Sequence, residues 1–319
     1  MALHRYRIRK PEHGGQEWLN ARFWDEKGQK RISASPAAAI YGLHPFVPQD
    51  QFAAELLGDT PPSPIPPNPA MERGNRLEPF VLEWAADKLG IPFDTPEEMF
   101  VAESKGGARM IATLDGFHEV GDERQILEIK TTTRQWDGEL PDYWRIQGIH
   151  QAICADVEEI TWAVFDPSMI LHLHTQKVTP SEAAEHISAV EKWLNAIDLG
   201  MTPPGVHWSC ETISTRYAEP KEDSPVEAED KYLDLIDQLK HVKAELKSYE
   251  ELEDKLKAQL CELIGDHTSL VIGGRTVATW RPQTRDSLDI KAFKAAHPEI
   301  ARIFSKKVTT RTLLLKGAK

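Results

Sequence analysis

The chain has 319 residues, which predicts two domains, because a typical domain has roughly 100–200 residues. Its 50 acidic and 38 basic residues give a formal net charge of -12, whereas nucleic-acid-binding domains are usually basic. The charge is unevenly spread, however. Residues 270–319 contain eleven Lys and Arg against three Asp and Glu, a net charge of +8. This asymmetry predicts a basic C-terminal module with a role separate from that of the acidic body.

Neither a membrane helix nor a disulfide framework is expected. No apolar run approaches the roughly 20 residues of a membrane helix, and no apolar segment follows the basic N-terminus, which argues against a secretory signal. Cys154, Cys210 and Cys261 are too few and too far apart for a disulfide framework or a four-cysteine metal site. We therefore expect a cytoplasmic protein in a reducing compartment.

Spacing and turn residues predict an α/β or α+β core. Helices are predicted, in chain order, over residues 16–22, 35–41, 71–89, 141–155 and 181–199. Strands are predicted over residues 98–102, 108–114, 125–129, 159–165 and 169–175, the first three as a meander. Ser35 and Pro36 suit the N-cap and first turn of a helix. Residues 58–70 contain six prolines and predict an extended loop.

The composition changes after residue 205. Proline clusters and acidic residues over residues 206–225 predict a linker, which separates a domain over residues 1–205 from a C-terminal module over residues 226–319. Beyond its first helix, this module should contain strands over residues 270–272, 276–280 and 311–315 and a helix over residues 290–304. Its cations form either a solvated face or a DNA-guiding surface; they include Arg275, Arg281, Arg285, Lys306, Lys307 and Arg311.

Residues 226–264 predict a long amphipathic helix or a helical pair, because their apolar side chains recur three and four positions apart. One step departs from this alternation, since Leu246, Tyr249 and Leu252 are each three residues apart. That step breaks the heptad and favours packing against the chain's own body over a long two-stranded coiled coil.

Acidic and basic side chains interrupt an apolar strand in the middle of the first domain. Glu128 and Lys130 should point to one face of this strand and Ile129 to the other, because side chains alternate. Asp115 ends the preceding strand of the expected meander, so it should lie beside Glu128. Two carboxylates are hard oxygen ligands that suit Mg²⁺ or Mn²⁺. A neighbouring Lys can position a water molecule for attack on phosphorus.

Each of these residues also has an ordinary explanation. An acidic residue and a Lys two positions apart are common on solvated strands, but the apolar neighbours of Glu128 indicate burial, and buried charges need a partner. Glu78 on the preceding helix is either a third carboxylate of the site or a solvated Glu. Gln147 and Gln151 share a helix face that either lines a cleft or meets solvent.

Taken in order, these residues resemble the core of the PD-(D/E)xK nucleases. The set is Glu78, Asp115, Glu128-Ile129-Lys130 and Gln147. More narrowly, the chain resembles the YqaJ-type viral recombinases, the family of lambda exonuclease. The flanking matches are EWLNAR at residues 17–22, ISAS at residues 32–35, GNRLEP at residues 74–79, and Trp136, Pro141 and Tyr143. The resemblance covers roughly residues 16–200 and implies a restriction-endonuclease-like core, a central mixed sheet flanked by helices.

The resemblance also implies a role for each residue. Asp115 and Glu128 would ligate the metal together with the Ile129 carbonyl, and Glu78 would ligate it directly or through water. Lys130 would orient or activate the attacking water, and Gln147 would assist it. The same resemblance assigns the phosphate at a DNA 5′ end to a basic and a hydroxyl side chain, Arg22 and Ser35.

The chain departs from the family pattern at three places. Leu114 stands where the family often has Pro before its aspartate, and the segment between Arg22 and Ser33 is longer than usual. Some relatives have a second glutamine at the position of Ile149. Gln151 is not expected to replace it, because residues two and four positions along a helix point in different directions.

The histidines and tryptophans of the first domain are expected to be structural rather than functional residues. A metal site is not expected at the histidines of the first domain, because no acidic partner lies at ligand spacing; these are His118, His150, His172 and His174. Trp144 and Trp162 are expected in the core rather than as base-stacking groups.

The leading hypothesis is a Mg²⁺-dependent exonuclease of phage or prophage recombination that acts on duplex DNA ends. The resemblance implies 5′→3′ digestion, a ring-like homo-oligomer and a single-strand annealing protein as partner. Two alternatives stay open: a nicking or structure-selective endonuclease of the same fold, and a non-catalytic DNA-binding or assembly protein that uses the long helix and basic tail.

Overall fold

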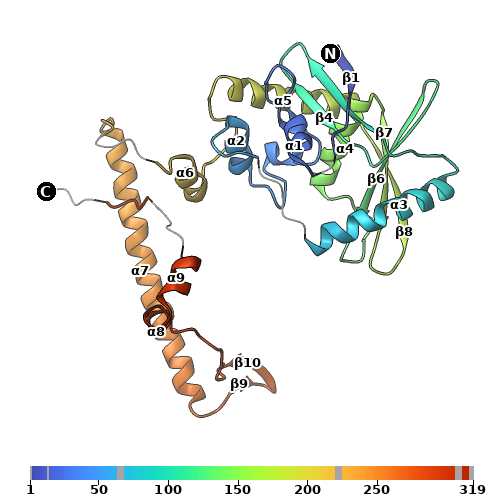
Figure 1. The fold of residues 1–319 in the computed structure, drawn as a ribbon. Coiled ribbons are helices and arrows are strands. Elements are labelled where there is room, and N and C mark those ends of the chain that lie inside the picture. Colours follow the sequence, from blue (N-terminus) through green and yellow to red (C-terminus); the bar gives the residue numbers. More distant parts are fainter. Residues whose placement is uncertain (1, 13, 63–67, 220–224, 306–310, 316–319) are drawn as a thin grey trace. The chain divides into compact units, whose positions relative to one another are not determined.

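The computed structural model describes residues 2–12, 14–62, 68–219, 225–305 and 311–315, and the chain divides into two units, Met1–Tyr217 and Ala218–Lys319. The first unit contains helices and strands in the mixed order that an α+β fold requires (Figure 1). It also includes part of the range predicted as a linker, because a short helix, α6 (Cys210–Arg216), lies within residues 206–225.

Two mixed four-stranded sheets form the framework of the first unit. The first sheet has the order β1-β3-β4-β2, with β1 (Leu3–Arg9), β2 (Ile32–Ser33), β3 (Glu98–Ser104) and β4 (Arg109–Ala112). The second has the order β5-β6-β7-β8, with β5 (Gly116–Val120), β6 (Glu123–Thr131), β7 (Glu159–Phe165) and β8 (Leu171–Lys177). Each sheet contains one parallel pair, β2–β4 and β6–β7 respectively. The single mixed sheet expected from the resemblance is therefore divided in two.

Helices surround these sheets. They are α1 (Gln16–Phe23), the 3-10 helix η1 (Ala37–Tyr41), α2 (Gln49–Leu57), α3 (Pro69–Leu89), α4 (Asp142–Ala155) and α5 (Pro180–Asp198). Figure 1 shows α3 crossing the sheet of β6 and β8. Asn68 caps α3, and Gly90 ends it in the left-handed conformation that is common at the C-terminal ends of helices. Thr179 and Glu182 form a capping box at the start of α5.

The alternation of side chains along β6 separates two parts of the core. Leu127 and Ile129 pack with Val81 and Ala85 of α3 in one hydrophobic cluster. Ile126, on the opposite face, packs in the larger cluster that contains α4 and α5. The predicted orientation of Ile129 away from Glu128 and Lys130 is confirmed, because neighbouring strand residues face opposite sides.

Several sequence-based predictions of elements were wrong. The expected three-stranded meander does not form, because β4 and β5 belong to different sheets and residues 113–115 connect them. Strands β1, β2 and β5 and helix α2 were not predicted. Within residues 35–41 only the 3-10 helix forms; it follows Pro36, and Ser35 is not its N-cap.

The second unit contains one long helix, α7 (Lys231–Ile264), a hairpin of β9 (Ser269–Ile272) and β10 (Arg275–Thr279), and two short helices, α8 (Ile290–Ala296) and α9 (Pro298–Phe304). The helix predicted over residues 290–304 is divided because Pro298 cannot continue α8 and instead begins α9. No strand forms over residues 311–315. Lys306 and Lys307 lie outside the described residues.

A buried pair of histidines joins α4 to α5. The Nδ1 atom of His150 lies 3.0 Å from Nε2 of His186, whose Nδ1 atom lies 2.9 Å from the Tyr41 hydroxyl. Both imidazoles are buried. Burial lowers the pKa of His186 to about 4, and burial and His186 hold the pKa of His150 well below its usual value. Both side chains are therefore neutral in the folded protein at neutral pH.

This pair predicts that the free energy of unfolding decreases in mild acid. The unfolded chain binds protons at a His pKa near 6.5, whereas folded His186 does so only near 4, so stability is lost as the pH falls between these values. The loss at pH 4 should be about 3 kcal/mol for His186. Denaturant unfolding of wild type and His186→Leu from pH 7 to 4 measures it.

His207 provides the matched control, because its side chain is exposed in the folded protein. His207→Gln should show the same pH dependence as wild type, whereas His186→Leu should show a flatter one. Equal slopes for His186→Leu and wild type would contradict this account.

Candidate active site

The Glu128 carboxylate lies at the centre of a hydrogen-bond cluster and is 3% exposed. Its Oε1 atom accepts from Lys130 Nζ at 2.8 Å and from Gln147 Nε2 at 2.5 Å. Its Oε2 atom accepts from Gln151 Nε2 at 2.6 Å. A charge can be buried at this position because one cation and two amides from α4 satisfy it.

Asp115 reaches this cluster from the connection between the two sheets. Gly116 pairs with Leu127 at the start of β5, so the next position places Asp115 beside Glu128, as predicted, although not through the expected meander. Its Oδ2 atom accepts from the Ile129 N–H at 2.8 Å. A side chain at position 116 would collide with its neighbours, since a Cβ there would lie 2.7 Å from Cδ1 of Leu82. Glycine thus lets β5 approach α3 closely and sets the position of Asp115.

The Ile129 carbonyl lies on the same edge of β6 as Asp115. In a strand the N–H and C=O of one residue project to the same side, and the Ile129 N–H points to the Asp115 carboxylate. The ladder with β5 ends at Leu127, so β5 does not cover this edge. A carbonyl and a carboxylate oxygen are therefore available side by side.

The carboxylates of the site disfavour one another's charge. Burial and the nearby Glu128 raise the pKa of Asp115 well above its usual value, and Glu78 contributes to this rise. Burial and Glu128 also raise the pKa of Glu78. The structure thus brings Glu78 of α3 within electrostatic reach of the two other carboxylates. Burial lowers the pKa of Lys130, but Glu128 and Asp115 outweigh that effect and raise it, which keeps the ammonium charged.

Two stacked tryptophan rings lie beside the ammonium group of Lys130. Trp144 and Trp162 are buried with ring centroids 5.8 Å apart, and Lys130 Nζ lies 6.0 Å and 5.7 Å from them respectively. The core position predicted for both rings is confirmed. Their faces also contact a cation of the candidate site, which favours the charged form of Lys130.

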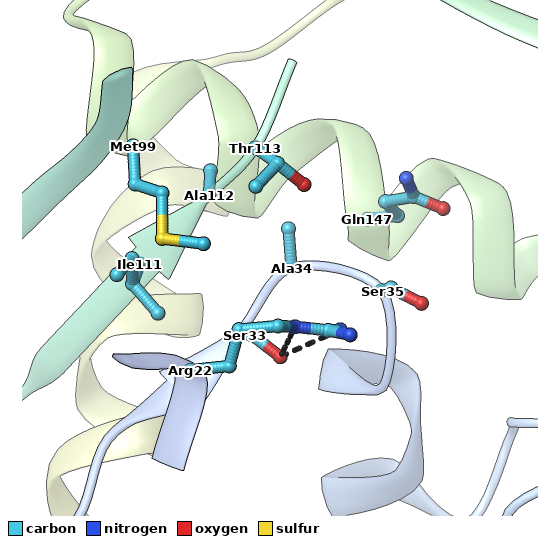
Figure 2. A pocket seen from close by; sticks show the side chains of 9 residues that line it. All are labelled: Arg22, Ser33, Ala34, Ser35, Met99, Ile111, Ala112, Thr113 and Gln147. Carbon is cyan, nitrogen blue, oxygen red and sulfur yellow. Dashed lines mark hydrogen bonds between the residues drawn. The ribbon is translucent and has the colours of Figure 1, made fainter. Parts of the chain in front are cut away.

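Arg22 and Ser35 lie at a pocket that Gln147 also lines (Figure 2). The same Gln147 side chain donates to the Glu128 carboxylate. The Arg22 guanidinium donates to the Ser33 hydroxyl at 3.2 Å and 3.0 Å and lies 4.3 Å from the Trp18 ring. Burial lowers the pKa of Arg22 to about 10, so it stays protonated at neutral pH. In the described part of the chain no carboxylate forms an ion pair with Arg22.

Within the described ranges, no three His, Cys, Asp or Glu side chains are already arranged around a single metal position. The donor set nevertheless fits Mg²⁺ in atom type, since Asp115, Glu128 and the Ile129 carbonyl offer hard oxygens. It also fits in charge, because a cation would relieve the repulsion that raises the pKa of Asp115 and Glu78.

The histidines lie apart from this donor set. Nε2 of His172 lies 3.0 Å from the carboxylate of Asp166, which precedes it by six residues. Trp136 packs edge-on against His172 and His174. The Nδ1 atom of His118 lies 2.8 Å from the Pro92 carbonyl oxygen. These contacts explain the histidines as structural residues.

Comparison with known proteins identifies the domain that carries this site. Residues 17–158 match the family model of the YqaJ-like viral recombinase domain. This part of the chain is a YqaJ-like viral recombinase domain. The seven site residues named from the sequence as ligands, catalytic groups and phosphate contacts fall within it, and so does the Ile129 carbonyl. No curated protein matches the chain.

Two solved structures are similar to part of the chain. An alkaline exonuclease from Laribacter hongkongensis is 19% identical, with a TM-score of 0.46, over 58% of this chain and 93% of that one. A phage-related exonuclease from Haemophilus somnus 129PT is 13% identical, with a TM-score of 0.38, over 54% and 96% respectively. The family assignment itself rests on residues 17–158.

Gln151, which the sequence placed on the same helix face as Gln147 but which was not assigned a role in the site, contacts the central carboxylate. It lies one helical turn after Gln147, and its amide bonds both Glu128 and the Thr113 carbonyl, at 2.6 Å and 3.2 Å. The position two residues after Gln147, Ile149, packs in the core instead. The structure thus selects the cleft-lining alternative for this helix face, because residues four positions apart point the same way.

The crowding of carboxylates predicts that Asp115→Asn is more heat-stable than wild type when EDTA is present. An amide keeps an oxygen that accepts from the Ile129 N–H and removes the repulsion by Glu128. The increase in Tm should be about 2–4 °C. Calorimetry in EDTA measures it, with Asp122→Asn in an exposed turn as the control. A lower Tm for Asp115→Asn than for wild type would contradict the electrostatic account.

Proposed function

We propose that the recombinase domain is a Mg²⁺-dependent deoxyribonuclease that digests duplex DNA from its ends in the 5′→3′ direction. The observation that carries this proposal is the buried Glu128 carboxylate. It accepts hydrogen bonds from three side chains, Lys130, Gln147 and Gln151, and Asp115 lies beside it. Carboxylates with perturbed pKa values cluster at functional sites, and the raised pKa of Asp115 and of Glu78 beside Lys130 follows this pattern.

The residues that would hold the metal are Asp115, Glu128 and the Ile129 carbonyl, with Glu78 contributing directly or through water. When bound, Mg²⁺, or Mn²⁺ in its place, would neutralise the phosphate and lower the pKa of a bound water. The raised pKa of Asp115 and of Glu78 supports this choice, because both carboxylates gain most from a nearby cation.

Lys130 and Gln147 would act on the attacking water and on the phosphate. The ammonium of Lys130 stays charged, so it donates hydrogen bonds and stabilises negative charge that develops on phosphate oxygens. Gln147 has one amide group that bonds both Glu128 and Lys130. It therefore holds the two charged groups at a fixed separation and lines the pocket beside them.

Arg22 and Ser35 would bind a phosphate group at the 5′ end of the DNA. The guanidinium is partly buried and has a hydroxyl and an aromatic ring as its nearest described partners, which leaves its charge to be balanced by an anion. Gln147 connects this pocket to the carboxylates. A bound end phosphate would thus lie next to the hydrolytic groups.

The proposed setting is recombination of a phage or prophage in the cytoplasm of a bacterial host. A single-strand annealing protein would receive the strand left by digestion, and the nuclease would act as a homo-oligomer. Among the described residues, every helix is too short or too polar to cross a membrane.

Lys130→Ala should decrease the rate of digestion of linear duplex DNA by about 100-fold or more, because a positioned charged donor is lost. Release of acid-soluble nucleotides from end-labelled DNA, in Mg²⁺ and in EDTA, measures the rate. The exposed hairpin residue Lys105 supplies the control Lys105→Ala. Equal digestion by Lys130→Ala and wild type would contradict the assignment of this site.

Covalently closed circular DNA distinguishes the proposed activity from the alternatives. An exonuclease leaves the circle intact, whereas cleavage of it in Mg²⁺ would indicate an endonuclease of the same fold. Binding of DNA without any cleavage in Mg²⁺ or Mn²⁺ would indicate a non-catalytic DNA-binding protein.

Arg22→Ala should decrease digestion of DNA with a 5′ phosphate by about tenfold or more and leave digestion of 5′-hydroxyl ends nearly unchanged. The reason is the loss of a charge-assisted contact to the terminal phosphate. Initial rates on the two substrates measure this preference, with the exposed Lys27 changed to Ala as control. If Arg22→Ala slows both substrates equally, the end-binding role is wrong and the nuclease assignment is unaffected.

A further inference from the structure

The long helix of the second unit carries an exposed apolar stripe along its whole length. Helix α7 runs unbroken from Lys231 to Ile264. Eight apolar side chains of the stripe are 46–68% exposed: Tyr232, Leu235, Val242, Leu246, Tyr249, Leu256, Leu260 and Leu263. Within the second unit, the described elements leave this face exposed, and Ile264 is the only buried residue of α7. An exposed apolar surface of this extent indicates an interface.

The stripe keeps a heptad register, contrary to the sequence interpretation. The two spacings from Leu246 to Tyr249 and from Tyr249 to Leu252 are three residues each. The next two spacings, to Leu256 and then to Leu260, are four residues each. The four steps together span two heptads, so the register resumes. With Tyr232 at position a, every a and d position up to Leu263 is apolar except Glu253 at one a position. This stripe is about 48 Å long and has the form of a coiled-coil seam.

We propose that α7 pairs with α7 of a second copy of this chain as an antiparallel two-stranded coiled coil. In the register that matches the two stripes end to end, Tyr232 lies opposite Leu263 of the second copy and Leu246 opposite Tyr249. Glu253 then faces Val242 rather than another charge. The partner is a second copy because the stripe complements itself under a twofold axis.

The flanking charges select this arrangement over a parallel one. In the antiparallel pair, Lys243 lies opposite Glu250 of the second copy, and the twofold axis repeats this attraction once. A parallel pair would instead place Glu245 against Glu250 twice and would bury Glu253 against itself at the seam. The parallel arrangement is therefore disfavoured by three like-charge contacts.

The same charges select the register of the antiparallel pair. A shift of one heptad in one direction places Glu250 against Glu250 of the second copy. A shift in the other direction places Lys243 against Lys243. Only the end-to-end register pairs opposite charges and also uses the whole stripe, so length and charge point to one geometry.

Charge reversal in the full chain tests the pairing. Lys243→Glu should weaken dimerisation by about tenfold, because two attractions become two repulsions. The double variant Lys243→Glu/Glu250→Lys restores opposite charges and should restore the wild-type affinity. Lys247→Glu, on the outer face of the helix, should have no effect. Sedimentation equilibrium of the purified full chain across the micromolar range measures each dissociation constant.

Each result decides for or against the proposal. Self-association through the nuclease unit would persist equally in all variants, so differences between them report α7 alone. A monomeric wild type, an unchanged Lys243→Glu or a double variant that is not restored would overturn the pairing. Cover of the stripe by another part of the same chain would give one of these results.

Disulfide cross-linking tests the orientation, in a background with Cys210→Ser and Cys261→Ser. Leu235 of one copy lies opposite Leu260 of the other in the proposed pair. A mixture of Leu235→Cys and Leu260→Cys chains should therefore form a mixed disulfide under mild oxidation, whereas neither variant alone should cross-link. Cross-linking of Leu235→Cys with itself would indicate a parallel pair and overturn the proposal.

Discussion

The buried Glu128 carboxylate is the constraint on which the rest of the first unit depends. An uncompensated charge at a position only 3% exposed would be strongly destabilising, so the structure must bring partners to it. Lys130 comes from the same strand, and Gln147 and Gln151 come from α4. These bonds fix α4 over β6, and they explain why a helix rich in buried side chains presents two amides to the sheet. Asp115 lies beside Glu128, and the repulsion between these two carboxylates is greatest when no cation is bound between them.

The acidic character of the chain is consistent with this arrangement. A net charge of -12 is unfavourable for a DNA enzyme, but part of that charge is concentrated where a divalent cation would neutralise it. The partly buried guanidinium of Arg22 supplies positive charge at the adjoining pocket. Local distribution of charge, rather than its sum, therefore decides whether a phosphate can approach the site.

The sequence predicted the orientation of side chains along β6 better than the pairing of the strands around it. Apolar alternation was enough to orient Glu128, Lys130 and Ile129, because period-two burial is a local property of β6. Local pattern could not show that β4 and β5 separate into two sheets, since strand pairing depends on distant partners. The strand β1 was missed because its alternating basic residues were interpreted only as charge. The heptad of α7 was misjudged because one short step was not followed to the point where the register resumes.

Anomalous diffraction from crystals soaked with Mn²⁺ tests the central claim most directly, because it locates the metal without relying on activity. The account predicts a single strong peak within bonding distance of the Asp115 and Glu128 carboxylates and the Ile129 carbonyl, with Glu78 bound directly or through water. It also predicts that the peak disappears in Asp115→Asn. A peak at another group of residues, or no peak at saturating Mn²⁺, would contradict it.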